Sequence, residues 1–198
     1  MPYEYRHMTP EERTVVIEER RRRGYPLHSP PHPYRKAGWY CIAATHYEHA
    51  HIMGSSSRLN AFEDQLLSEL AGIQAEVGGW VILTNHYHFM AGVQSLEHIS
   101  AMLKHLHGAT ARMWNLEDGL TGRRKVWCKF YDRCIRDERH YYHALNYIHY
   151  NTVKHGYVES SYDWPWSSVH LYFDTHGREW LREKWVQYPP GDEWDYGD

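Results

Sequence analysis

Residues 38–156 alternate between two apolar patterns, and this alternation limits the fold more than any other feature of the chain. Short runs rich in aromatic and β-branched residues are typical of strands, whereas apolar residues spaced by three and four positions are typical of amphipathic helices. The patterns predict strands at 39–45, 80–84, 88–93 and 126–135 and helices at 59–77, 96–113 and 138–155. The two middle strands adjoin as a hairpin. This order favours an α+β fold in which an antiparallel sheet carries its helices on one face, as in ferredoxin-like proteins.

The two ends of the chain differ from this central region. Thr9, Pro10 and Glu12 have the spacing of a capped helix start, and a proline-rich run follows at 26–33. The last residues carry four carboxylates, and the chain of 198 residues is long enough for one well-buried domain. We therefore divide it into a basic helical and proline-rich arm at 1–37, one domain at 38–173, and a C-terminal extension with an acidic tail at 174–198.

The net charge of the chain is −3 with histidines neutral, so an overall basic surface for wrapping duplex DNA is absent. Any contact with nucleic acid must use a local patch, and residues 112–139 are locally basic. The Lys and Arg residues of this stretch are Arg112, Arg123, Arg124, Lys125, Lys129, Arg133, Arg136 and Arg139. They are candidate phosphate contacts, although a solvated surface explains the same pattern. Trp127 and Tyr131 lie among them and either stack on unpaired bases or belong to the core.

Three cysteines form neither an even set nor a close zinc-binding pair, which favours structural thiols in a reducing compartment. No apolar run approaches the roughly 20 residues of a membrane span, and the N-terminus is charged where a signal peptide is apolar. We therefore expect a cytoplasmic protein without a membrane partner.

Two histidines are placed as candidate metal ligands. His86 and His88 lie two residues apart in an extended segment, so their side chains point to the same side of a sheet and can share one metal ion. His105 and His107 have the same spacing but lie in a helical pattern, where positions two apart diverge by about 200° around the axis. We expect that second pair to be solvated or to cap backbone groups. A histidine pair alone is weak evidence in a chain with 17 histidines.

Tyr147 and Asn151 lie four residues apart in the last predicted helix, so both project from one face of it. A tyrosine phenolate is a competent nucleophile at phosphorus. A divalent ion can polarise the attacked phosphate. Two imidazoles and an amide oxygen suit Mg²⁺ or Mn²⁺ poorly to moderately, but bound waters and the DNA phosphate would complete the shell with oxygen, so we rank Mg²⁺ and Mn²⁺ ahead of Zn²⁺. The alternative is that Tyr147 packs in the helix as one of 17 tyrosines and Asn151 only belongs to the helix end.

The chain has a His-Tyr-His strand at 86–88, followed by a Tyr-Ile-His-x-Asn helix at 147–151. These two motifs, in this order along the chain, resemble those of the REP-associated tyrosine transposases. These are single-tyrosine HUH enzymes, named after two histidines flanking a hydrophobic residue. The resemblance extends through 131–136, 146–158 and 163–168. It implies an HUH nuclease fold, with His86, His88 and Asn151 as metal ligands and Tyr147 as the nucleophile.

The same resemblance implies cleavage and strand transfer of hairpin-forming single-stranded DNA, such as REP-like repeats, through a 5′-phosphotyrosine and a free 3′-hydroxyl. Whether the protein is a monomer or a homodimer stays open. Two other functions stay open as well: a non-catalytic, domesticated nucleic-acid-binding protein, and an HUH replication initiator. Tyr141, Tyr142 and Tyr150 are the remaining candidate nucleophiles. Thr84 and Thr152 stand where the family commonly has prolines.

Two further segments have competing interpretations. His46, Glu48, His49 and His51 are either surface histidines, a DNA-contacting edge or a second metal site. The aromatic segment 164–168 contains no reacting group, so we expect it to pack a C-terminal extension onto the domain, with hairpin binding as the alternative.

Overall fold

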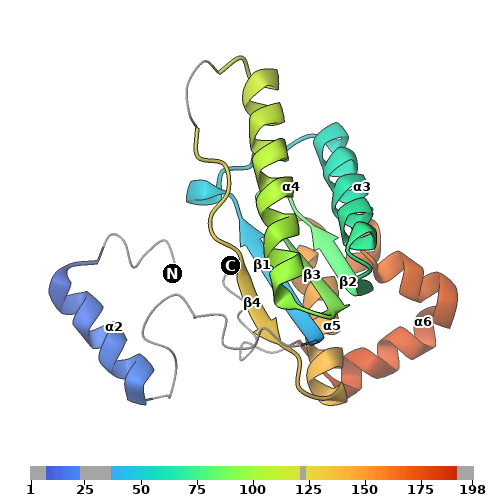
Figure 1. Cartoon of the computed structure of the whole chain (residues 1–198). Coiled ribbons are helices and arrows are strands. Elements are labelled where there is room, and N and C mark those ends of the chain that lie inside the picture. Colours follow the sequence, from blue (N-terminus) through green and yellow to red (C-terminus); the bar gives the residue numbers. More distant parts are fainter. Residues whose placement is uncertain (1–7, 23–36, 121–123, 191–198) are drawn as a thin grey trace.

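The computed structural model describes residues 8–22, 37–120 and 124–190. The strands are β1 (Gly38–Thr45), β2 (Glu76–Ile82), β3 (His86–Val93) and β4 (Tyr131–Cys134). The α-helices are α2 (Pro10–Arg22), α3 (Ser56–Gly72), α4 (Leu96–Glu117), α5 (Glu138–Lys154) and α6 (Val169–Gln187) (Figure 1). Two short 3₁₀ helices are η1 (Tyr47–His49) and η2 (Ser161–Asp163).

The four strands form one antiparallel sheet in the order β2-β3-β1-β4. Helix α3 connects β1 to β2, and helix α4 connects β3 to β4, so each helix crosses over one intervening strand. This is the split β-α-β arrangement of ferredoxin-like folds. The predicted α+β class and antiparallel sheet are confirmed.

Helices cover both faces of the sheet, whereas the sequence analysis placed them on one face (Figure 1). Helices α3 and α4 pack on one face, against side chains such as Tyr40 and Phe89. Helix α5 packs on the other face, against Cys41, Val81 and Met90. The strands are apolar on both sides, so one layer of helices would leave an apolar face in water. Helix α5, which follows the last strand, covers that second face.

Several predicted boundaries differ from those of the structure. Helix α3 ends at Gly72 rather than at 77, because Gln74 has a φ of 55° and the chain turns there. Val77 belongs to β2, and β3 already begins at His86. Of the strand predicted at 126–135 only β4 is regular. The preceding residues run beside η1, where Trp127 makes an isolated bridge to His46.

Both predicted ends of α5 are confirmed. The Asp137 carboxylate accepts a hydrogen bond of 2.7 Å from the His140 backbone N–H, which satisfies one of the unpaired donors at the helix start. At the other end Gly156 has a φ of 69°, the left-handed conformation that terminates many helices and that glycine adopts without strain. These local contacts determine where α5 begins and ends, and hence which of its residues face the sheet.

The aromatic segment 164–168 packs along the outer edge of β2. The Trp164 indole donates to the Ile82 carbonyl at 2.8 Å, and the Ile82 N–H donates to the Trp166 carbonyl at 2.9 Å. Ser167 forms an isolated bridge with Val81. The segment thereby pairs polar backbone groups at an edge that would otherwise be open.

The ends of the chain are described only in part. The predicted helix start is confirmed in α2, where Thr9 and Glu12 exchange side-chain and backbone hydrogen bonds. The proline-rich run and the acidic tail lie outside the described residues. Helix α6 continues across the predicted boundary at 173 and bends at Gly177, where φ is 79°. The division into three regions stays a prediction. None of the described helices is long and apolar enough to span a bilayer.

Candidate functional site

His86 and His88 lie on the face of β3 that α5 covers. Their ring centroids are 5.3 Å apart, and both residues are at least 97% buried, with exposed fractions of 3% and 0%. The pairing register places His88 between Val81 of β2 and Ala43 of β1, so the pair sits on an inner strand. The sequence prediction that both rings share one face is confirmed by this arrangement.

Tyr147 and Asn151 meet the two histidines from α5. The Asn151 side-chain oxygen lies 2.9 Å from His86 Nε2. The rings of Tyr147 and His88 meet edge to face, with centroids 5.5 Å apart. The structure therefore brings together the four residues singled out in the sequence. They come from only two elements, and the spacing of two on a strand and four on a helix makes this possible.

The hydrogen bonds around Asn85 fix how the His86 ring is oriented. The Asn85 amide nitrogen donates to the His49 carbonyl at 3.3 Å, and its Oδ1 accepts from the Tyr157 hydroxyl at 3.4 Å. The same Oδ1 lies 2.7 Å from His86 Nδ1. An amide oxygen only accepts, so His86 Nδ1 carries the proton and donates it. In neutral His86 the lone pair is then on Nε2, directed at Asn151.

His86 Nε2 and Asn151 Oδ1 are then two acceptors that face each other at 2.9 Å. Asn151 is fully buried, and its amide nitrogen has no hydrogen-bond partner among the described residues. Two lone pairs at this separation repel unless a proton or a cation lies between them, or unless the amide is turned over. A metal-binding histidine usually donates its other ring N–H to an oxygen, as His86 does to Asn85. The donor set therefore fits a divalent cation.

His86 and His88 are not joined by further side chains of the usual metal-binding types into a complete set of ligands among the described residues. Within residues 8–22, 37–120 and 124–190, no group of three or more His, Cys, Asp and Glu side chains could hold a metal ion. A cation here would rely on His86, His88 and Asn151, with water or substrate oxygens completing its shell. Mg²⁺ and Mn²⁺ commonly keep such outside ligands.

The Tyr147 hydroxyl is capped by a lysine from the end of the same helix. Lys154 Nζ donates to Tyr147 Oη at 3.1 Å and lies 4.9 Å from the ring centroid. Tyr147 is only 3% exposed, whereas Tyr150 on the same helix is 42% exposed. Tyr141 and Tyr142, the other alternative nucleophiles, pack against Trp39 and Tyr188 respectively and do not contact the histidine pair in the described contacts.

A pocket of about 490 Å³ opens beside His86. Its lining comes from the loop after β1, the β2–β3 turn and the end of α5. The lining residues are His49, His51, Asn85, His86, His155, Gly156 and Tyr157. The His155 ring packs edge to face on His86 with a centroid distance of 4.8 Å. Through this pocket a small polar molecule can reach one side of His86, the candidate metal ligand.

His149, the histidine of the helix motif at 147–151, has a structural role. It is fully buried, and its Nε2 pairs with Ser168 Oγ at 2.9 Å, which ties α5 to the segment at the edge of β2. Burial lowers the pKa of His149 to about 3, so the ring is neutral near neutral pH.

The cluster at 46–51 does not form a second metal site. His46 is fully buried, with its Nδ1 2.9 Å from the Ala50 carbonyl and its ring 4.3 Å from that of Trp127. His49 and His51 instead line the pocket beside His86. His107 also differs from the prediction, because it stacks on Trp127 at 4.4 Å and pairs with the Tyr87 hydroxyl at 2.7 Å rather than facing solvent.

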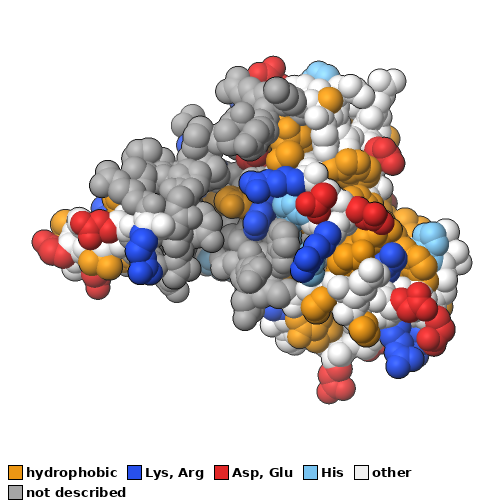
Figure 2. Space-filling view, turned by 90° about the horizontal axis from the view of Figure 1, so that it is seen from below, with side chains coloured by type: hydrophobic (Ala, Val, Ile, Leu, Met, Phe, Trp, Pro, Cys, Tyr) orange, Lys and Arg blue, Asp and Glu red, His pale blue; other side chains and the backbone are white. Residues whose placement is uncertain are grey.

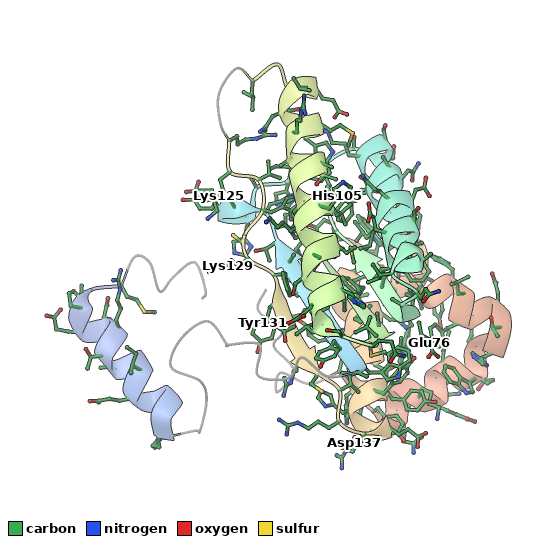
Figure 3. All side chains as sticks on the ribbon, viewed as in Figure 1. Glu76, His105, Lys125, Lys129, Tyr131 and Asp137 are labelled. Atoms are coloured by element: carbon green, nitrogen blue, oxygen red, sulfur yellow. The ribbon has the colours of Figure 1, made fainter. Side chains whose placement is uncertain are left out.

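The basic stretch 112–139 is divided between structural and exposed side chains. Arg124 bonds to Asn115 and Asp118 at 2.9 and 2.7 Å, so its charge is already used within the protein. The exposed members are Arg112, Lys125, Lys129, Arg136 and Arg139, Arg133 is partly buried, and Arg123 lies outside the described residues. Lys125, Lys129 and Tyr131 follow one another along the segment beside α4 (Figure 3).

Acidic and basic side chains alternate on the face shown in Figure 2, where Lys and Arg form small separate groups rather than one continuous basic area.

Trp127 is 8% exposed and belongs to the core, which decides between the two interpretations offered for it. Base stacking by this ring is therefore excluded in the observed packing.

Sequence reasoning missed four residues around the site. Asn85, Tyr157 and His155 surround His86, and Lys154 caps Tyr147. Lys154 and His155 had a usable indication in the sequence: Lys154 follows Tyr147 by seven residues, about two helical turns, and His155 follows Asn151 by four, so each lies on the same face as its partner. Asn85 and Tyr157 lie outside the helices and strands, where no periodic pattern predicts the path of the chain.

An antiparallel ferredoxin-like sheet carries a His-x-His pair on an inner strand, and the pair faces a helix with a tyrosine, which is the arrangement that the resemblance implied. Comparison with known proteins confirms the resemblance to the REP-associated tyrosine transposases. A REP-associated tyrosine transposase of Escherichia coli strain K12 is 29% identical over 99 residues, which is 48% of this chain and 54% of that protein. A candidate REP-associated tyrosine transposase of Haemophilus influenzae is 50% identical over 46 residues, 23% of this chain and 26% of that protein.

The chain thus matches about half the length of one curated relative and about a quarter of the other. A solved structure described as a REP-associated tyrosine transposase bound to a REP hairpin shares the fold, with a TM-score of 0.62 and 21% sequence identity. The match covers 76% of this chain and 88% of that one. No protein-family model matches the chain.

Proposed function

We propose that this protein cleaves and rejoins hairpin-forming single-stranded DNA in a metal-dependent reaction, with Tyr147 as the nucleophile. The observation that carries the proposal is the cluster formed by His86, His88, Asn151 and Tyr147 between β3 and α5. The relatives named as tyrosine transposases, and the neighbour described with a bound REP hairpin, support the substrate class.

The reaction transfers one phosphodiester bond to the protein. Tyr147 Oη bonds to the phosphorus while the bond from phosphorus to the 3′ oxygen breaks, which leaves a 5′-phosphotyrosine and a free 3′-hydroxyl. The phenol proton leaves to solvent, and the departing oxygen takes up a proton. Attack by a 3′-hydroxyl of another strand reverses these steps and releases Tyr147. The bond energy is kept in the phosphotyrosine, so joining needs no nucleotide cofactor.

His86, His88 and Asn151 would hold the divalent ion. When bound, Mg²⁺ or Mn²⁺ supplies a positive charge that polarises the phosphate. Asn85 holds the proton of His86 on Nδ1 and so keeps Nε2 available as a donor of electrons. The pocket beside His86 has room for part of a nucleotide next to that group.

Contacts with the DNA backbone are expected from exposed cations of the basic stretch rather than from Arg124. Arg136 and Arg139 are candidates, because they are exposed and lie just before and within the first turn of α5, the helix that carries Tyr147. The net charge of −3 makes such local contacts necessary.

The test is covalent capture of DNA. Radiolabelled single-stranded DNA bearing a hairpin is incubated with the protein and Mn²⁺, Mg²⁺ or EDTA, and denaturing electrophoresis then detects protein that has become labelled. We expect a metal-dependent adduct that disappears in Tyr147→Phe and in His86→Ala. Tyr150→Phe is the matched control, because it removes an exposed hydroxyl from the same helix. An adduct that persists in Tyr147→Phe would show that another residue is the nucleophile.

The burial of Tyr147 favours a second candidate, a structure-specific binder without catalysis. The residue is 3% exposed and its hydroxyl is already bonded to Lys154, so DNA must displace the lysine to reach the hydroxyl. Hairpin affinity that is insensitive to EDTA, together with no adduct in any metal, would support this alternative.

A further inference from the structure

Lys154 is the last residue of α5 and lies on the same helical face as Tyr147 and Asn151. Its ammonium contacts the phenol oxygen at 3.1 Å and overlies the ring at 4.9 Å from the centroid. Tyr147 carries the reactive oxygen of the proposed function, on which this inference rests. The contact therefore places a full positive charge at the atom that would bond to phosphorus.

We propose that Lys154 is a catalytic residue that binds the phosphate attacked by Tyr147. In the free protein its ammonium donates to Tyr147 Oη. When phosphorus bonds to that oxygen, the phosphate oxygens come to lie next to the same atom, within reach of Nζ. The lysine then exchanges its bond with the phenol for a bond with a non-bridging phosphate oxygen.

The electrostatic reason is the charge that develops during attack. A phosphodiester already carries one negative charge, and the entering phenolate adds another around the same phosphorus. A positioned ammonium in a partly buried site offsets this charge more strongly than water does. Lys154 stays next to the phosphotyrosine once it has formed, so it serves the joining step as well as cleavage.

The alternative is that Lys154 only stabilises the helix. A cation over an aromatic ring and a cation in the last turn of a helix each contribute modestly to stability. Lys184 offers a matched comparison, because its ammonium also lies over a tyrosine ring, 4.2 Å from the Tyr142 centroid. This lysine–tyrosine pair has no contact with His86 or His88 in the described contacts. A purely structural role predicts similar consequences for losing either lysine.

The experiment measures the single-turnover rate of adduct formation with hairpin DNA at saturating protein, together with hairpin affinity and the melting temperature. We expect Lys154→Gln to lower the rate about a hundredfold, while affinity and melting temperature stay close to those of the wild type. Lys154→Arg keeps the positive charge and should recover most of the rate. Lys184→Gln should leave the rate unchanged.

The outcomes separate the role of Lys154 from the proposed function. A normal rate in Lys154→Gln overturns the inference and leaves the proposed function standing. A loss of rate in Lys154→Gln that follows its loss of thermal stability, and that Lys154→Arg does not recover, also overturns it in favour of a structural role. The absence of any adduct in the wild type overturns the proposed function itself, and the role of Lys154 with it.

Discussion

Each ring nitrogen of His86 faces the side-chain oxygen of an asparagine. Asn85 fixes the proton on Nδ1, and Asn151 faces the electron pair on Nε2. Tyr157 in turn donates to Asn85 and pairs with the Thr84 hydroxyl at 2.7 Å. Thr84 stands where the related family commonly has proline, and here its hydroxyl takes part in the hydrogen-bond network.

Asn85→Ala should therefore weaken the binding of Mn²⁺ by about ten- to a hundredfold, because His86 loses the partner that fixes its ring and its proton. Isothermal titration with Mn²⁺ measures the effect without requiring activity. Asn60→Ala is the control, since Asn60 accepts a hydrogen bond from Trp166 at the protein surface. Equal affinity in Asn85→Ala and the wild type would mean that Asn85 does not orient a metal ligand.

The elements meet at the site because α5 lies close on β2 and β3. Two adjacent glycines of β2 permit this approach. A Cβ at Gly79 would stand 2.7 Å from Leu145 of α5, and one at Gly78 would stand 2.7 Å from Trp39 and 2.8 Å from the Tyr141 hydroxyl. The positions of Tyr147 and Asn151 on α5 thus depend on two glycines of β2 that leave room for the helix.

Gly78→Ala should lower the free energy of unfolding by about 1–3 kcal/mol, because the added methyl group must displace packed aromatic rings. Urea unfolding followed by tryptophan fluorescence measures the change. Gly72→Ala, at the end of α3, has no atom within 4 Å of the new Cβ and should be neutral or slightly stabilising. Similar stability in both variants would contradict the close approach of α5 to the sheet.

At the scale of the whole molecule, buried histidines couple stability to pH. Burial lowers the pKa of His46 to about 4 and that of His107 to about 3. Both are neutral in the folded protein, whereas in the unfolded chain they bind protons below about pH 6.5. The unfolded state therefore holds more protons between about pH 6.5 and about pH 4, and stability falls as the pH is lowered through this window.

Each of these histidines should contribute a loss of up to about 1.4 kcal/mol per pH unit in that window. We expect His107→Phe to make the free energy of unfolding less dependent on pH, as measured by urea titrations at about pH 7 and about pH 5. His98→Gln, at an exposed position of α4, serves as the control. An unchanged pH dependence in His107→Phe would show that its ring also gains a proton in the folded state.

The amino-acid sequence by itself determined the features that depend on local periodicity. Alternation along β3 put His86 and His88 on one face of a strand, helical spacing put Tyr147 and Asn151 on one face of a helix, and the helix predicted at 138–155 corresponds to α5. These properties follow from backbone geometry over a few residues. The pairing of the histidine strand with the tyrosine helix was implied by the family resemblance rather than by this local geometry.

Only the tertiary structure decided which faces meet. It placed α5 on the side of the sheet opposite α3 and α4, buried His46 and His107 against Trp127, and brought Asn85 and Tyr157 to His86. Such contacts join residues far apart in the chain and depend on how complete apolar surfaces pack, which a pattern of a few residues does not specify. Lys154 lies between the two cases: its helical face follows from spacing, but its contact with the Tyr147 hydroxyl follows from the fold.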